Sequence, residues 1–260
     1  MNALLTAFSL IFGAVVGSFL NVVILRLPNE DKSIVFPGSH CPLCGHPLSW
    51  WENIPLISYL LLKGRCRGCN ARISWQYPLV EAVMAVFSAV LFQRFGVSID
   101  FCIMFAFFAA LLVIIFIDIH HQIIPDLISL PFIILGFAAS FFSTQVTWQQ
   151  SGLGILAGGG VLYLVAFGYY AFTGRDGMGG GDIKLLAMIG AFLGWQSLLY
   201  VVFASSLVGS LIGIIAMIKQ GKGGRTRIPF GPFLAFGAMT WVMFQEQIFA
   251  LWNLYLDLAR

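Results

Sequence analysis

Long apolar runs, interrupted by short polar segments, constrain the fold of this chain more than any other feature of its sequence. Hydrophobic residues make up 59% of its 260 positions and charged residues only 10%, whereas soluble domains carry about 25% charged residues. A helix of about 20 apolar residues crosses a bilayer core, and only helices and closed barrels satisfy every backbone group in lipid. Because the runs lack the alternation of barrel strands, they predict an all-α polytopic membrane protein.

Eight segments of the sequence are expected to be transmembrane helices. These are residues 3–25, 78–95, 101–118, 126–142, 152–173, 182–195, 198–218 and 233–255. The first run could instead be a cleaved signal peptide, but no basic segment precedes it and no small-residue cleavage site follows it. We therefore expect residues 1–26 to remain as the first membrane helix.

The basic residues predict how the chain is oriented in the membrane. If the N-terminus lies outside, twelve of the fourteen lysines and arginines fall at or near the cytoplasmic side, which is the distribution that membrane proteins favour. The twelve are Arg26, Lys32, Lys63, Arg65, Arg67, Arg72, Arg175, Lys184, Lys219, Lys222, Arg225 and Arg227, and the two outside are Arg94 and Arg260. This distribution accounts for the net charge of +3. We therefore expect contact with membrane lipid and no nucleic-acid partner.

Residues 27–77 form the only sizeable polar segment and contain two Cys-x-x-Cys pairs, Cys41 with Cys44 and Cys66 with Cys69. Two such pairs supply the four thiolates of a closed, tetrahedral zinc site. The predicted orientation makes this loop cytoplasmic, where disulfides are disfavoured. A segment this small buries little apolar surface, so a metal would supply much of its folding energy. We predict a structural Zn²⁺, with redox or chance pairing as the alternatives.

Four other polar or reactive residues receive structural interpretations from sequence. Cys102 lies in an apolar run and is expected to be a small core residue. Asn21 is expected to hydrogen-bond to a neighbouring helix. Glu81 falls in the first turn of the second expected helix, where the helix dipole stabilises an acidic group. Asp126, after Pro125, is expected to cap or open the fourth helix. For Asn21 and Glu81 a functional contact also remains open.

Two aspartates stand where expected membrane helices meet the cytoplasmic side. Asp118 ends an inward-running helix and Asp182 begins an outward-running one, so we expect them at similar depth. Ionisable residues bordering membrane spans are candidates for function. Two carboxylates that share a proton can deprotonate water and protonate a departing amine. Spacing alone leaves a second interpretation open, in which Asp182 caps one helix and Asp118 marks the end of another.

A glycine-rich turn, Gly177-Met178-Gly179-Gly180-Gly181, leads directly into Asp182. Glycines adopt backbone conformations closed to other residues, and they let an extended substrate lie against the chain. Neither of the common glycine-rich phosphate-binding fingerprints is present. We therefore predict that Gly179, Gly180 and Gly181 form an active-site loop beside Asp182.

Taken together, these motifs resemble those of the type IV prepilin peptidases, the leader peptidases of type IV pili and type II secretion. The resemblance covers nearly the whole chain and includes the four cysteines. The other segments that carry it are Gly17-Ser18-Phe19-Leu20-Asn21-Val22-Val23-Ile24-Leu25-Arg26-Leu27-Pro28, Glu52-Asn53-Ile54-Pro55, Tyr77-Pro78-Leu79-Val80-Glu81, Ile117-Asp118, Ile124-Pro125-Asp126, Gly179-Gly180-Gly181-Asp182-Ile183-Lys184 and Pro229-Phe230-Gly231-Pro232.

The resemblance implies a G-x-G-D membrane aspartic protease of the bacterial inner membrane, with Asp118 and Asp182 as the catalytic residues. It implies cleavage of a leader from prepilins or pseudopilins at the cytoplasmic face. It also implies N-methylation of the new N-terminus with S-adenosylmethionine, because relatives that lack the cysteine-bearing loop are taken to lack methylation and this chain has the loop. The loop has no glycine-rich Rossmann fingerprint, so the sequence identifies no residue that contacts the methyl donor.

The resemblance also divides the chain into three parts. Residues 1–26 are the first membrane helix, residues 27–77 a zinc domain with a part in methyl transfer, and residues 78–260 the membrane peptidase domain. Three alternative functions remain at this stage. One is a peptidase without methylation, another a non-enzymatic scaffold of a pilus or secretion assembly, and the third a transporter that uses the carboxylates as a proton relay.

Overall fold

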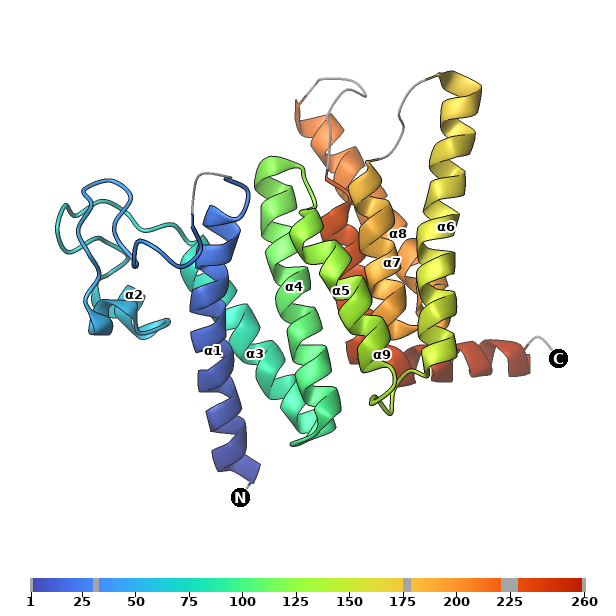
Figure 1. Ribbon diagram of the computed structural model, residues 1–260, viewed down its shortest axis with the longest axis horizontal. Coiled ribbons are helices and arrows are strands. Elements are labelled where there is room, and N and C mark those ends of the chain that lie inside the picture. Colours follow the sequence, from blue (N-terminus) through green and yellow to red (C-terminus); the bar gives the residue numbers. More distant parts are fainter. Residues whose placement is uncertain (1, 30–32, 175–178, 221–228, 259–260) are drawn as a thin grey trace. The chain divides into compact units, whose positions relative to one another are not determined.

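The computed structural model describes residues 2–29, 33–174, 179–220 and 229–258 (Figure 1). Within these ranges every regular element is a helix, apart from two isolated bridges in the cysteine-bearing segment. The elements are α1 (Asn2–Arg26), the short 3₁₀ helix η1 (Trp50–Asn53), α2 (Ile57–Leu61), α3 (Gln76–Phe95), α4 (Ile99–His121), α5 (Asp126–Ala139), α6 (Trp148–Thr173), α7 (Gly180–Leu193), α8 (Trp195–Gln220) and α9 (Gly231–Leu258). The all-α prediction is confirmed.

Five of the described helices, α1, α3, α4, α6 and α8, are long and apolar enough to cross a membrane. The predicted count of eight spans is not confirmed. Helices α5 and α7 have 14 residues each, or about 21 Å, which is shorter than a bilayer core. Helix α9 is interrupted by a non-helical backbone conformation at Phe244, and its two parts run in different directions (Figure 1).

The structure also corrects three local predictions. Helix α4 continues to His121, so Asp118 lies inside its last turn rather than at its end. Helix α3 begins at Gln76, which places Glu81 beyond the first turn. Cys102 is exposed on α4, so the prediction of a core position was wrong. In a membrane protein lipid supplies the apolar surroundings, and an apolar run need not be buried in protein.

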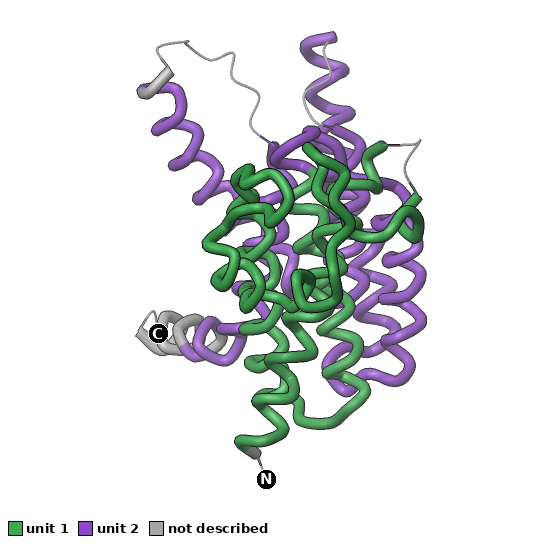
Figure 2. The backbone as a smooth tube through the Cα atoms, turned by 90° about the vertical axis from the view of Figure 1, so that its left-hand side faces the viewer, with its two compact units in different colours: residues 1–117 green, residues 118–260 purple. Residues whose placement is uncertain are grey.

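The chain divides into two compact units, residues 1–117 and residues 118–260 (Figure 2). In the first unit α1 and α3 pack closely through small residues on α1. A Cβ atom added to Gly13 would lie 2.6 Å from the Met84 carbonyl oxygen, and one added to Gly17 would lie 2.8 Å from the Glu81 Cα. Small residues of this kind let membrane helices approach each other. The α1–α3 contact therefore requires glycine at both positions.

Helix α7 is the central helix of the second unit. Residues 185–193 are all buried, and α7 contacts α5, α6, α8 and α9 (Figure 1). A helix that is apolar on all sides is buried in this way. Its closest neighbour is α6, where Gly154 and Gly190 face each other with no room for a side chain on either. The residues at the start of α7 are thereby held on a rigid support.

The contact between α6 and α7 predicts opposite effects for two similar substitutions. Gly154→Ala should lower the melting temperature in detergent, because its Cβ would collide with the Gly190 backbone, and overpacking of this kind costs about 1–3 kcal/mol. Gly160→Ala on the same helix is the control, since no atom of the described residues lies within 4 Å of its new Cβ and alanine favours helix. Equal melting temperatures for the two variants would contradict this packing.

Candidate active site and metal centre

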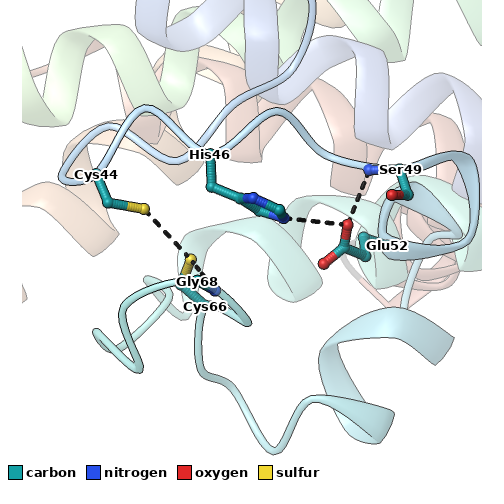
Figure 3. Close-up of polar contacts among 6 residues, drawn as sticks. All are labelled: Cys44, His46, Ser49, Glu52, Cys66 and Gly68. Atoms are coloured by element: carbon teal, nitrogen blue, oxygen red, sulfur yellow. Dashed lines mark hydrogen bonds and ion pairs between the residues drawn. The ribbon is translucent and has the colours of Figure 1, made fainter.

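The four predicted cysteines of the first unit converge on one point. Their sulfur atoms all lie within 4.8 Å of one another. The Cys41 and Cys69 sulfurs are 3.9 Å apart. Those of Cys44 and Cys66 are also 3.9 Å apart (Figure 3). Zn–S bonds of about 2.3 Å in a tetrahedron place sulfurs about 3.8 Å apart. The donor set and its geometry therefore fit one zinc ion.

The two cysteine pairs are held by the same backbone hydrogen bonds. In each pair the N–H of the first cysteine donates to the carbonyl five residues later, and its carbonyl accepts from the N–H four residues later. The partners are His46 and Gly45 for Cys41, and Ala71 and Asn70 for Cys66. Gly45 and Asn70 both adopt positive φ, 72° and 57°, which glycine and asparagine tolerate best. The sequence thus folds each pair into a similar turn.

The electrostatics of the sulfur cluster favour a bound cation. Backbone N–H groups of Cys44 and Leu43 lower the pKa of the Cys41 thiol below its ordinary value. The His46 N–H acts in the same direction on Cys44, but burial and the neighbouring sulfurs raise the pKa of the Cys44 thiol. Four thiolates cannot all form at this distance without a positive charge among them. A divalent metal ion supplies that charge.

A buried carboxylate to which the sequence analysis assigned no role, that of Glu52, supports the first cysteine pair. Glu52 accepts a hydrogen bond from the Ser49 N–H at 2.8 Å, and the same oxygen lies 3.5 Å from His46 Nε2 (Figure 3). The Ser49 N–H and the nearby imidazole lower the pKa of Glu52. The Ser-x-x-Glu spacing of a capping box was the sequence signal for this contact. Glu52 thus ties the metal loop to η1.

In the second unit, Asp118 and Asp182 come from different helices and lie near each other. Asp118 is 5% exposed, and one of its oxygens accepts the Gly231 N–H at 3.1 Å. Asp182 lies in the first turn of α7. Gly181, which precedes Asp182, and Gly231, whose N–H binds Asp118, border the same Ile124 side chain, because a Cβ atom on either glycine would lie within 3.4 Å of Ile124 Cδ1. The structure therefore brings together the two carboxylates that the sequence singled out.

Glycines surround this pair of carboxylates. Gly179 is the N-cap of α7 in an extended conformation, followed by Gly180 and Gly181. A Cβ on Gly181 would lie 3.0 Å from the Ile124 side chain. Gly177 and Met178 lie outside the described residues. The part of the predicted loop that is described thus leads directly to Asp182, with little side-chain bulk around it.

Gly231 contributes to the site in a way the sequence did not reveal. A Cβ atom on Gly231 would lie only 2.5 Å from the Asp118 carboxylate oxygen and 3.2 Å from Ile124. The absence of a side chain therefore lets the start of α9 donate its N–H to Asp118. The Pro-Phe-Gly-Pro segment marked this region in the sequence, but no local sequence pattern indicates that it contacts a residue in α4.

An ion pair joins the ends of α5 and α7 beside these groups. Lys184 Nζ lies 2.6 and 2.8 Å from the two oxygens of Asp126. Asp126 opens α5, as predicted, but its side chain binds Lys184 rather than capping its own helix. Partly exposed pairs contribute about 0.2–1 kcal/mol. The pair therefore adds little stability but connects α5 to the turn of α7 that carries Asp182.

Comparison with known proteins identifies two family models in the chain. Residues 11–95 match the bacterial Peptidase A24 N-terminal domain, and residues 105–214 match the Type IV leader peptidase family. Proteins named prepilin leader peptidase/N-methyltransferase are similar over most of their length. That of Pseudomonas putida is 36% identical (92% of this chain, 91% of the relative), that of Pseudomonas aeruginosa 38% (92% and 90%) and that of Stutzerimonas stutzeri 38% (97% and 94%). No solved structure matches the chain.

The sulfur cluster predicts a zinc content that depends on particular cysteines. Purified protein should contain about one zinc ion per chain, and changing Cys66 and Cys69 to serine should abolish it because two thiolates cannot close the site. Cys102→Ser should retain full zinc, since Cys102 lies outside the cluster. Elemental analysis of the three proteins checks this, and undiminished zinc in the double variant would refute the metal assignment.

Proposed function

We infer the function of this chain from the fact that it belongs to the type IV leader peptidase family. We propose that it is a bacterial inner-membrane enzyme that cleaves the leader peptide of prepilins and pseudopilins and N-methylates the new N-terminal residue. Its several apolar helices and the names of its relatives support this function. The observation that carries the cleavage step is that Asp118, in the last turn of α4, lies near Asp182, in the first turn of the buried helix α7.

In the proposed hydrolysis, Asp118 and Asp182 hold one water molecule between them. One carboxylate takes a proton from the water as it attacks the scissile carbonyl, and the other gives a proton to the departing amine. The Gly231 N–H fixes the orientation of Asp118, and the packing of α7 fixes Asp182. Such preorganisation keeps the reacting groups aligned.

The glycines before Asp182 suit an extended substrate. Peptide bonds are cleaved in extended conformations that expose both faces of the backbone, and side chains beside the carboxylates would block that approach. Among the described residues, a Cβ atom added to Gly180 would meet no other atom within 4 Å, and one added to Gly179 would meet only the Asp182 carboxylate. We therefore propose that Gly179, Gly180 and Gly181 border the bound segment around the scissile bond.

We propose that methyl transfer belongs to the N-terminal part of the chain. S-adenosylmethionine would supply the methyl group, as the names of the relatives imply. The zinc ion would be structural, because four thiolates leave no open coordination position. Residues 27–77 would then form the zinc domain, between the first membrane helix (1–26) and the peptidase domain (78–260) in the sequence.

We also propose an orientation with the N-terminus outside and the zinc loop in the cytoplasm. The distribution of lysine and arginine supports it, because twelve of the fourteen fall at or near that side. Asp118 and Asp182 then lie near the cytoplasmic face, where the leader of a newly made prepilin is found.

The aspartate pair predicts complete dependence of cleavage on each member. Asp118→Ala and Asp182→Ala should each reduce cleavage of a prepilin substrate by at least about 10²-fold, because general acid–base catalysis contributes about 10²–10⁴-fold. Asp100→Asn, another buried acid of α4, should cleave normally. Mass spectrometry of the substrate measures the effect. Full processing by the Asp182→Ala variant would end the proposal, whereas uncut precursor distinguishes a peptidase from a scaffold.

The contact between Gly231 and Asp118 predicts that displacing the Asp118 carboxylate slows prepilin cleavage. Gly231→Ala should slow cleavage by about 10- to 100-fold, because its Cβ would push the Asp118 carboxylate out of place. The matched control is Gly168→Ala on α6, where the new Cβ meets no atom within 4 Å in the part of the chain that the structure describes. Cleavage rates of the two variants at equal protein concentration test this, and equal rates would mean that Asp118 is not positioned by this contact.

A further inference from the structure

A second pair of buried polar side chains lies in the first unit, where α1 and α3 meet the zinc loop. Asn21 of α1 is 1% exposed and Glu81 of α3 is 7% exposed. Neither takes part in the proposed hydrolysis, whose residues all belong to the second unit. Polar groups are buried in apolar surroundings only at a cost, unless they find partners. The partners that these two side chains have, and those that they lack, indicate what they can bind.

Of the two polar atoms in the Asn21 side chain, only the nitrogen has hydrogen-bond partners among the described residues. Its nitrogen donates to the Tyr77 carbonyl at 3.1 Å and approaches the Gly17 carbonyl at 3.4 Å, which confirms the predicted interhelical hydrogen bond. Exchanging the amide nitrogen and oxygen would point the oxygen at two carbonyls, so the orientation is fixed. The Asn21 oxygen is buried and has no hydrogen-bond partner among the described residues. An unsatisfied acceptor of this kind costs about 1–3 kcal/mol.

The carboxylate of Glu81 has a backbone hydrogen-bond donor but no cation beside it among the described residues. It accepts the Leu56 N–H at 2.8 Å. No lysine, arginine or histidine in the described part of the chain forms an ion pair with it. The buried Glu52, by contrast, faces His46. A buried carboxylate without a counter-ion is strongly disfavoured in its charged form, so Glu81 is suited to a positively charged ligand.

The backbone that reaches Glu81 is strained. Leu56 has φ 61° and ψ −48°, and the Ile57 N–H donates to the Pro55 carbonyl at 2.6 Å. These contacts define the rarer, positive-φ form of the γ-turn, which costs about 1–3 kcal/mol at a residue other than glycine. The turn directs the Leu56 N–H at Glu81 and holds the zinc loop against the helix pair.

Asn21 and Glu81 lie within one helical turn of each other. Glu81 follows Tyr77, the partner of Asn21, by four residues on α3, and Gly17, four residues before Asn21, lies against the Glu81 backbone. The Asn21 oxygen can only accept hydrogen bonds, and the Glu81 carboxylate in its ionised form also only accepts and carries a negative charge. A ligand group that satisfies both must be a donor and positively charged. A primary ammonium group has this chemistry.

We propose that Asn21 and Glu81 bind a primary ammonium group during methyl transfer. The proposal rests on the proposed function, because both reactants of that step carry such a group. S-adenosylmethionine has an α-ammonium group, and the processed pilin has a new N-terminus. The ammonium group would donate to the unpaired Asn21 oxygen and neutralise Glu81. Methyl transfer thereby requires residues of α1 and α3 as well as the zinc loop.

Ligand binding tests the proposal without turnover. The full-length protein in detergent is titrated with S-adenosylhomocysteine and with its deamino analogue, which lacks only the ammonium group. Wild-type protein and the control Ser88→Ala, a buried serine on the same α1–α3 contact, should prefer S-adenosylhomocysteine by at least about 10-fold. Glu81→Gln and Asn21→Ala should lose that preference. A purely structural role would weaken both ligands equally and leave the preference unchanged.

A second arm of the experiment tests the other source of the ammonium group. If the variants keep the preference for S-adenosylhomocysteine, Glu81→Gln should instead raise the KM for methylation of a mature pilin peptide by at least about 10-fold. In either case zinc content and leader cleavage should stay at the wild-type level, because neither the cysteines nor the aspartates are changed.

Two results would overturn the inference, and they are distinguishable. If Glu81→Gln and Asn21→Ala keep both the ligand preference and the peptide KM, the proposed ammonium site at Asn21 and Glu81 is wrong while the proposed function stands. If wild-type protein cleaves a prepilin but neither binds S-adenosylhomocysteine nor methylates the product, the proposed methyltransferase activity is wrong. The ammonium site at Asn21 and Glu81 is then wrong as well, because it depends on that activity.

Discussion

Three buried carboxylates in this protein are each held by a hydrogen bond from a backbone N–H group. Asp118 accepts from Gly231, Glu81 from Leu56 and Glu52 from Ser49. Apolar surroundings offer a carboxylate no water, so the backbone must come close enough to donate. The same constraint explains the support of the metal loop, the position of the aspartate pair and the strained turn at Leu56.

Close backbone approach depends in turn on residues without side chains. Gly231 leaves room for Asp118, and Gly17 lets α1 reach the backbone of α3 beside Glu81. Gly154 and Gly190 pack α6 against α7, which carries Asp182. The glycines thus act together: they hold rigid helices close, and they let helix ends, where backbone donors are free, approach the proposed catalytic and ligand-binding groups.

Much of this architecture could be predicted because it is encoded locally. Apolar runs located the long helices to within a few residues, and the cysteine spacing identified the metal ligands. Contacts between distant segments could not be predicted in the same way. No local pattern connects Gly231 to Asp118 across 113 positions, or Leu56 to Glu81. Hydropathy also cannot tell lipid from protein, which is why Cys102 was misplaced. It does not report backbone conformation either, so the break at Phe244 was missed.

The central claim is that Asp118 and Asp182 face each other in the folded protein. It can be tested by changing both residues to cysteine in a protein whose Cys102 is serine, and by treating the membranes with a short thiol cross-linker. We expect a cross-linked product whose digest contains the α4 and α7 peptides joined through positions 118 and 182. Independent modification of the two cysteines, without a cross-link, in protein that has retained its zinc would contradict the claim.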